Sequence, residues 1–169
     1  CRRHMIKYGT TSKQLGAIAV SQRNNAVLNS NAMQREPITI EDHQNSKVVV
    51  DPFRLLDICL ETDGACAVLV TSYENAKNWR KRPVIVRASA SQCGGKDQLV
   101  GYDWADTFLW EDLSQNFSGF LAPKLYQQAG LNPKDMDIAQ IYDCFTYTVI
   151  MSLEGLKKKK KGEGGLFVE

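Results

Sequence analysis

Three short apolar runs alternate with helical patterns along the chain from residue 65 onward, and this order constrains the fold more than any other feature. The runs are rich in aliphatic residues, as in strands covered on both faces of a sheet, and they span residues 65–70, 83–86 and 138–142. A helical pattern follows each of them, over residues 72–79, 123–130 and 145–156. This alternation predicts an α/β fold with a largely parallel sheet.

Residues 1–50 lack such a core pattern and are typical of short helices joined by polar loops. A first helix over residues 2–8 is expected to end at Gly9, and Thr11 or Ser12 can cap a second helix that breaks before residue 29.

Capping signals recur further along the chain. Thr39 and Asp42 have the spacing of a capping box for a short helix over residues 40–46, and Asn132-Pro133 predicts one short turn. Residues 92–117 are rich in glycine, aspartate and aromatic residues without a clear period, which predicts a long loop or an insertion.

The charge distribution gives no sign of a nucleic-acid partner. The chain has 21 basic and 19 acidic residues, and five of the positive charges lie in the run Lys157–Lys161. A nucleic-acid-binding face needs basic residues spread over a surface with stacking aromatics. We therefore expect the lysine run to be a solvated loop. No apolar run approaches the roughly 20 residues of a membrane span, so a membrane-spanning chain is not expected.

The cysteines and histidines do not form a recognisable metal or triad pattern. None of the five cysteines forms a CxxC pair and only His4 and His43 could join them, which argues against a zinc site. An odd number of cysteines on apolar backgrounds is typical of reduced thiols and a cytoplasmic protein. A Ser-His-Asp system is unsupported, and His43 is expected in a solvated segment.

One loop places three reactive side chains in consecutive positions. Tyr142, Asp143 and Cys144 supply a phenol, a carboxylate and a thiol where the third apolar run gives way to the last long helix. Ligands of parallel α/β folds gather at such strand ends, and a helix N-terminus favours a thiolate or an enolate. The structural alternative is that Asp143 caps the helix, Cys144 is a small buried residue and Tyr142 fills a sheet edge. Both interpretations remain open from the residues alone.

Two glycine-containing segments are weaker candidates. Asp63-Gly64 is a common turn dipeptide and needs no function. Residues 162–165 lack the spacing of a phosphate-binding loop, so a plain flexible loop is the favoured interpretation and close approach of a substrate to the backbone is the alternative.

Four segments, in this order, resemble the thiolase superfamily and, within it, the lipid-transfer proteins related to sterol carrier protein type thiolases. They span residues 3–9, 37–57, 63–70 and 129–165. The resemblance implies a thiolase-like fold of layered α-β-α-β-α type with mixed, largely parallel sheets, of which this chain is an incomplete central portion. The nucleophilic cysteine is then expected ahead of Cys1, and the later histidine and cysteine loops beyond Glu169.

The resemblance also divides the chain. It assigns residues 1–50 to the loop domain over the coenzyme A tail, residues 51–82 to the end of the N-terminal thiolase half, and residues 83–169 to the first part of the C-terminal half. It implies that coenzyme A enters as a thioester substrate, with no further cofactor and no metal, and that the protein is a homodimer.

The site residues follow from the same resemblance. Sterol carrier protein type thiolases have His-Asp-Cys-Phe in this loop, and their histidine helps to bind the thioester oxygen. Tyr142 stands at that position here, as in thiolase-like proteins that cleave the side chain of steroid-CoA thioesters by a retro-aldol step. The resemblance implies a catalytic role for Tyr142, a place for Phe145 near the thioester, and substrate contact for Cys59, where many thiolases have a serine.

The implied function is an enzyme that acts on acyl-CoA or steroid-CoA thioesters. It makes or breaks a carbon–carbon bond through an enolate, by thiolase-type acyl transfer or by a retro-aldol lyase reaction. Related aldolases act with a small OB-fold protein, so such a partner is implied as well. The alternatives are a non-catalytic carrier of acyl-CoA or lipid, and a scaffold subunit of a hetero-oligomer.

Overall fold

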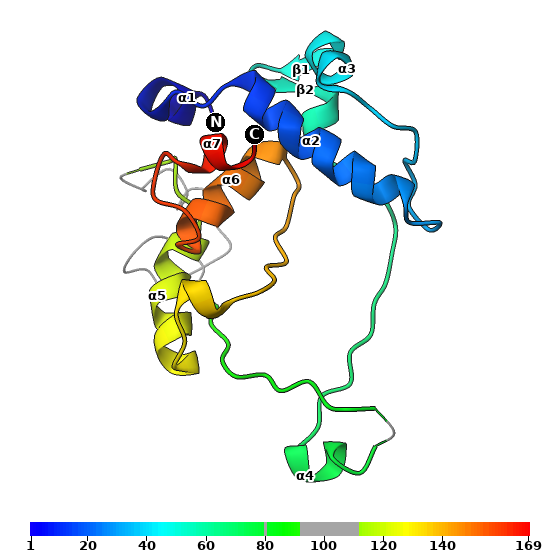
Figure 1. Cartoon of the computed structure of the whole chain (residues 1–169), viewed down its shortest axis with the longest axis vertical. Helices are drawn as coiled ribbons and strands as arrows, with labels where there is room; N and C mark the ends of the chain where they lie inside the picture. Colours follow the sequence, from blue (N-terminus) through cyan, green and yellow to red (C-terminus); the bar gives the residue numbers. More distant parts are fainter. Residues whose placement is uncertain (80, 92–111) are drawn as a thin grey trace.

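The structure, a computed structural model, describes residues 1–79, 81–91 and 112–169 and is mostly helical there, with one small antiparallel sheet (Figure 1). Up to residue 91, the elements are α1 (Arg2–Tyr8), α2 (Ser12–Val27), α3 (Ile40–Asn45), β1 (Val48–Val50), β2 (Phe53–Arg54), the 3-10 turn η1 (Leu55–Asp57) and α4 (Tyr73–Ala76). Those after residue 112 are α5 (Ser118–Ala129), the 3-10 turn η3 (Pro133–Asp135), α6 (Thr146–Gly155) and α7 (Gly164–Phe167).

The core lies where α2 crosses α6. Its buried members are Leu15, Ile18, Tyr147 and Ile150, contributed in equal number by the two helices. Helices α1, α3 and α7 surround this contact, and both chain ends lie beside it (Figure 1). The first and last parts of the described chain therefore fold together as one unit.

The N-terminal helices begin where the sequence predicts; α1 and α2 also end as predicted, and α3 ends at Asn45, one residue before its predicted end. Gly9 ends α1 in a left-handed conformation with φ 75°, which a residue with a side chain adopts only at a cost. The Thr11 side chain accepts a hydrogen bond from the Gln14 backbone, and the Gln14 side chain accepts one from the Thr11 backbone. Thr39 and Asp42 form the same reciprocal box at α3.

Helix α5 begins earlier than predicted. The sequence places its start at Pro123, whereas the structure begins the helix at Ser118 with Pro123 inside it. A proline in a helix removes one backbone hydrogen bond. The packing of α5 against α6, where Ala122 is fully buried, outweighs that loss. The predicted end at Gly130, with φ 65°, is confirmed, and so is the turn at Asn132-Pro133.

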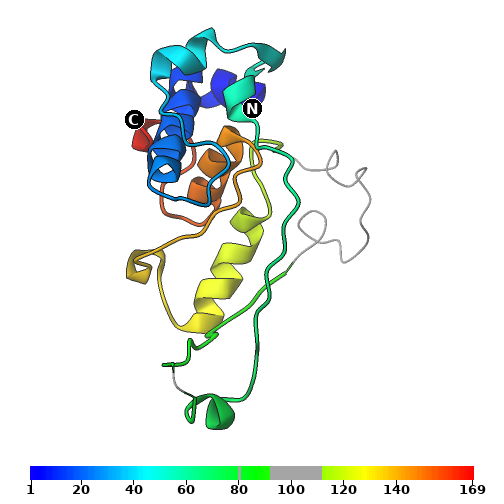
Figure 2. The ribbon, with the colours of Figure 1, turned by 90° about the vertical axis from the view of Figure 1, so that its right-hand side faces the viewer.

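The three predicted strands at residues 65–70, 83–86 and 138–142 do not form in the described part of the chain. Each segment is drawn as a long extended trace instead (Figures 1 and 2). A strand requires a hydrogen-bonded neighbour, and no described segment pairs with any of the three. Their aliphatic side chains are exposed accordingly, with Val68 at 85% and Val84 at 94%. The parallel sheet expected from the apolar runs is therefore absent from the described residues.

The only sheet among the described residues is not predicted by the sequence. Strands β1 and β2 pair antiparallel, with Val48 opposite Arg54 and Val50 opposite Phe53. Strands of three and two residues are too short to show the alternation by which strands are recognised in sequence. Residues 1–50 are thus not only helices and loops.

The middle of the chain extends away from the core. Figure 2 shows α4 at the far end of two long segments, remote from α2 and α6. The helix predicted over residues 72–79 forms as α4 with Ser72 as its N-cap, but it ends at Ala76 and not near Trp79. Most of the loop predicted over residues 92–117 lies outside the described residues. No helix among the described residues of the chain has the length and apolar character that spanning a bilayer requires.

We predict that Ile150→Ala lowers the free energy of unfolding by about 2–5 kcal/mol, because the truncation leaves a cavity in the α2–α6 contact. Ile150 is 0% exposed, whereas Ile6, on α1, is 82% exposed. The matched variant Ile6→Ala is expected to change the stability by less than about 0.5 kcal/mol. Urea unfolding of both variants measures the difference, and equal losses would contradict this location of the core.

Candidate active site

The loop that leads into α6 lies against the segment that follows η1. Ile58 and Phe145 form an antiparallel bridge, and the Cys59 N–H donates to the Cys144 carbonyl oxygen over 3.1 Å. Two of the predicted substrate-contacting residues, Cys59 and Phe145, are therefore neighbours in space although they are far apart in the sequence. Phe145 then takes the N-cap position of α6 with an extended backbone.

Side chains from two further elements hold this loop. The Phe53 ring of β2 stacks on Phe145, with centroids 5.0 Å apart and the planes tilted by 27°. The Gln22 amide of α2 donates to the Asp143 carboxylate over 2.8 Å. Asp143 consequently does not cap α6, which corrects one part of the structural alternative. Cys144 is half-buried, and its sulfur lies 3.4 Å from the Thr148 hydroxyl.

Tyr142 is the exposed member of the loop. Its side chain is 74% exposed and forms no hydrogen bond with any residue that the structure describes. It does not fill a sheet edge, as the structural alternative expected, and it takes no part in the contact between Cys59 and Phe145. The tyrosine of the first α6 turn, Tyr147, is 4% exposed, and burial followed by the nearby carboxylates of Glu154 and Asp112 raises its pKa. Of these two phenols only that of Tyr142 is open to a ligand.

A buried carboxylate anchors the start of α6. Asp57, 2% exposed, accepts hydrogen bonds from the Thr146 hydroxyl at 2.6 Å, from His43 Nε2 at 2.8 Å and from the Arg54 backbone at 2.8 Å. Burial alone raises the pKa of Asp57, but the hydrogen bonds from His43, Thr146 and Arg54 outweigh it and hold the pKa below its usual range. The carboxylate thus joins α3, η1 and α6.

His43 is fully buried and not solvated as its sequence context predicts. The Gln44 amide nitrogen donates to His43 Nδ1 over 2.9 Å, so Nε2 carries the proton that bonds Asp57. Gly16 of α2 makes room for the ring, because a Cβ there would lie 2.9 Å from His43 Nδ1. The residues next to His43 in the sequence are polar and do not indicate its burial, because its partner Asp57 lies further along the chain, beyond β1 and β2.

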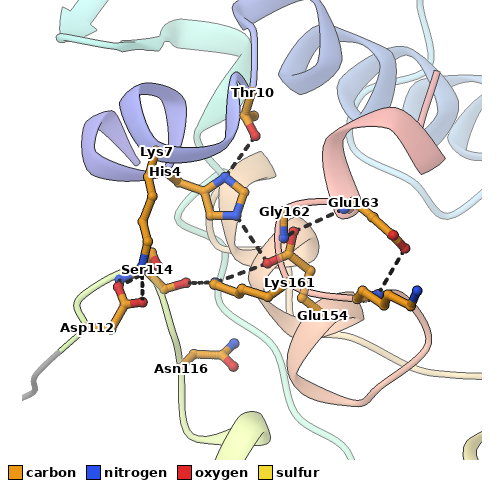
Figure 3. Close-up of polar contacts among 12 residues, drawn as sticks. His4, Lys7, Thr10, Asp112, Ser114, Asn116, Glu154, Lys161, Gly162 and Glu163 are labelled. Atoms are coloured by element: carbon orange, nitrogen blue, oxygen red, sulfur yellow. Dashed lines mark hydrogen bonds and ion pairs between the residues drawn. The ribbon is translucent and has the colours of Figure 1, made fainter.

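A second buried carboxylate anchors the C-terminal end of α6 (Figure 3). Glu154, 4% exposed, accepts from His4 Nε2 at 3.1 Å, from Lys161 Nζ at 3.0 Å, and from the backbone N–H groups of Gly162 and Gly164 at 3.0 Å each. Burial opposes its charge, but the bonds from His4, Lys161 and Gly164 hold the pKa of Glu154 below its usual range. His4 Nδ1 lies 2.8 Å from the Thr10 hydroxyl.

The glycine-rich segment is packed, contrary to the favoured expectation of a flexible loop. Gly164 and Gly165 are buried at the start of α7, and a Cβ at Gly164 would lie 2.9 Å from both Glu154 Oε1 and Ile150 Cγ2. Close backbone approach explains the glycines here, and the approaching groups belong to the protein itself.

The lysine run is also ordered and not simply solvated. Lys158 Nζ donates to the carbonyl oxygens of Pro133 and Met136 at 2.6 Å each. Lys159 lies over the Phe167 ring, 4.1 Å from its centroid. These contacts, together with the Lys161–Glu154 pair, give at least three of the five lysines a structural role.

The described residues contain no cluster of three or more histidine, cysteine, aspartate or glutamate side chains able to hold a metal ion. Tyr142 offers a phenol that can donate or accept a proton, and Cys59 and Cys144 offer two free thiols.

Comparison with known proteins shows a family to which part of the chain is similar. Residues 110–169 match the family described as "Thiolase C-terminal domain-like". The structure superimposes on a solved chain of an "Ltp2-ChsH2(DUF35) aldolase" with a TM-score of 0.89 and 38% sequence identity, over 99% of this chain and 43% of that chain. The chain is therefore similar to members of the thiolase superfamily.

Two curated relatives show the range of activities among similar proteins. The chain is 40% identical to the "17-hydroxy-3-oxo-4-pregnene-20-carboxyl-CoA lyase" of Mycobacterium tuberculosis, over 99% of this chain and 42% of the relative. It is 37% identical to an "Acetyl-CoA acetyltransferase" of Methanothermobacter thermautotrophicus, over 97% of this chain and 41% of the relative. The chain thus spans about two fifths of the length of these relatives.

We predict that Asp57→Asn destabilises the protein by about 1.5–3 kcal/mol at pH 7, the range for hydrogen bonds to a charged group. The pKa of the Asp57 carboxyl is lower in the folded state than in the unfolded state, where it is about 3.9. The ionised carboxylate therefore stabilises the fold at a pH above the unfolded pKa, and this stabilisation is lost as the pH falls through the folded pKa. The variant should therefore lose less stability than the wild type between pH 5 and pH 2. Asp137→Asn, at an exposed carboxyl, serves as control; a wild-type pH profile for Asp57→Asn would contradict the role of Asp57.

We predict that Gly164→Ala costs about 1–3 kcal/mol, because the added methyl group pushes Glu154 and Ile150 apart in a packed site. Gly64→Ala is the matched control, since no atom lies within 4 Å of a Cβ at that position. Thermal unfolding compares the two variants, and a flexible residue 162–165 segment would make them equally stable.

Proposed function

We propose that this chain is the part of a thiolase-superfamily enzyme that carries Tyr142, and that the enzyme cleaves a carbon–carbon bond beside a coenzyme A thioester by a retro-aldol reaction. The observation that carries the proposal is the exposed phenol of Tyr142 on a loop fixed from both sides. A lyase and an aldolase among the similar proteins support this choice over thiolase-type acyl transfer.

The proposed chemistry begins with a 3-hydroxyacyl-CoA, in which the hydroxyl carbon is bonded to the α-carbon of the thioester. Removal of the hydroxyl proton forms a carbonyl group, breaks the bond to the α-carbon and leaves its electron pair as a thioester enolate. Tyr142 donates a hydrogen bond to the enolate oxygen or delivers a proton to the α-carbon. The products are a ketone or an aldehyde and a shorter acyl-CoA.

Phe145 and Cys59 are proposed to contact the substrate beside Tyr142. The Phe145 ring, stacked on Phe53, offers an apolar surface for the thioester, and the exposed Cys59 thiol lies next to it for the pantetheine arm. A thiol is a weak hydrogen-bond donor, so the contact with Cys59 contributes position more than affinity.

The substrate class that we propose is a steroid-CoA or related bulky acyl-CoA thioester. The curated lyase carries a pregnene-carboxyl-CoA in its name, and the identity of 40% to that protein supports a substrate of this kind. We further propose a partner subunit with an OB-fold, in line with the second component that the solved aldolase carries in its name.

The division of the chain is part of the proposal. Residues 1–50 form the loop domain over the coenzyme A tail, residues 51–82 end the N-terminal half, and residues 83–169 begin the C-terminal half. The match of residues 110–169 to a C-terminal thiolase family supports the last assignment. A homodimer in the cytoplasm completes the proposal.

We predict that Tyr142→Phe in the full-length enzyme lowers kcat by about 10²–10⁴-fold, because the phenol acts only as the carbon–carbon bond breaks. The KM should change little, since the ring remains. Tyr73→Phe, at an exposed tyrosine on α4, is the matched control and should leave kcat unchanged. Steady-state kinetics with a 3-hydroxyacyl-CoA measure both values, and unchanged turnover in Tyr142→Phe would refute the assignment.

A further inference from the structure

Two cysteines from distant parts of the sequence face each other beside the candidate loop. The bridge between Ile58 and Phe145 sets the register of the two chain segments, and the Cys59 N–H donates to the Cys144 carbonyl oxygen over 3.1 Å. In an antiparallel pair this register places Cys59 directly opposite Cys144.

The side chains of the two cysteines lie on the same side of this short ladder. Cys59 and Cys144 are directly opposed across the antiparallel bridge at Ile58 and Phe145. Directly opposed residues of an antiparallel pair carry their side chains on the same face.

Opposed residues of this kind have their Cα atoms at a separation that a disulfide can span. Their Cα atoms are about 5.5 Å apart in a hydrogen-bonded pair, within the range of about 4.4–6.8 Å that disulfides span. Both sulfurs are free thiols in the structure, that of Cys59 being exposed and that of Cys144 half-buried. To form the bond, the Cys144 sulfur has to turn toward Cys59 from the Thr148 hydroxyl, which now lies 3.4 Å away.

We propose that Cys59 and Cys144 form a reversible disulfide with a small disulfide oxidant such as oxidised glutathione. The exposed Cys59 thiolate attacks one glutathione sulfur, forms a mixed disulfide and releases the first glutathione thiolate. The Cys144 thiolate then attacks the Cys59 sulfur and releases the second. Two protein thiols are oxidised, one glutathione disulfide is reduced to two glutathione molecules, and the protons of the two protein thiols pass to the glutathione thiolates.

The crosslink has a consequence for the candidate site. It ties the loop two residues after Tyr142 to the segment that carries Cys59, and it consumes the thiol proposed to face the pantetheine arm. Oxidation is therefore expected to reduce turnover. This consequence rests on the proposed function, whereas the disulfide itself rests only on the register of the two segments.

The test uses the full-length protein and an internal control, Cys66. This thiol is also free and exposed, but it lies in the unpaired segment of residues 65–70. The wild type and the variants Cys59→Ser, Cys144→Ser and Cys66→Ser are treated with oxidised glutathione, alkylated, digested without reduction and analysed by mass spectrometry.

We expect a linked peptide containing Cys59 and Cys144 in the wild type and in Cys66→Ser, lost on treatment with dithiothreitol. In Cys144→Ser, Cys59 should instead keep its glutathione adduct, because the resolving thiol is gone. Glutathione adducts on Cys59 of the wild type, or a link from Cys59 to any other cysteine, would overturn the proposal. Turnover is measured on the same oxidised wild-type sample; a complete Cys59–Cys144 link with full turnover would confirm the disulfide and count against the proposed site.

Discussion

The candidate site depends on the hydrogen bonds that the buried Asp57 carboxylate accepts. Its hydrogen-bond donors are the His43 ring of α3, the hydroxyl of Thr146, which is the first residue of α6, and the backbone N–H of Arg54. A buried charge is tolerated only when it is fully hydrogen-bonded, so these three contacts must form together. Their geometry fixes the start of α6 and, with it, the loop that presents Tyr142.

Glu154 performs the same task at the other end of α6. Its carboxylate accepts hydrogen bonds from His4 of α1, from Lys161 and from the backbone of the glycine-rich segment (Figure 3). With a buried acid near each end, α6 is held as a rigid support while Tyr142 stays exposed before its first turn. Rigid support under an exposed functional group is the arrangement that positions a catalytic side chain.

Local signals were readable from the sequence, and tertiary ones were not. The cap at Thr11, the capping box at Thr39 and the end at Gly9 depend on residues within one turn, and the structure confirms them. The apolar runs such as residues 65–70 predict strands correctly only if a partner segment pairs with them, and none of the described residues does. The resemblance found the loop at residues 142–145, but no local pattern could reveal that Cys59 lies opposite Cys144, because that contact depends on how distant segments fold together.

The most direct test is an assay of the full-length protein, with the proposed partner subunit, on a 3-hydroxyacyl-CoA in the absence of free coenzyme A. Retro-aldol cleavage needs no second thiol, whereas thiolysis requires free coenzyme A as acceptor. The account predicts release of a ketone or an aldehyde together with a shorter acyl-CoA from the hydroxy substrate alone. Cleavage of only a 3-ketoacyl-CoA, and only when coenzyme A is added, would contradict it.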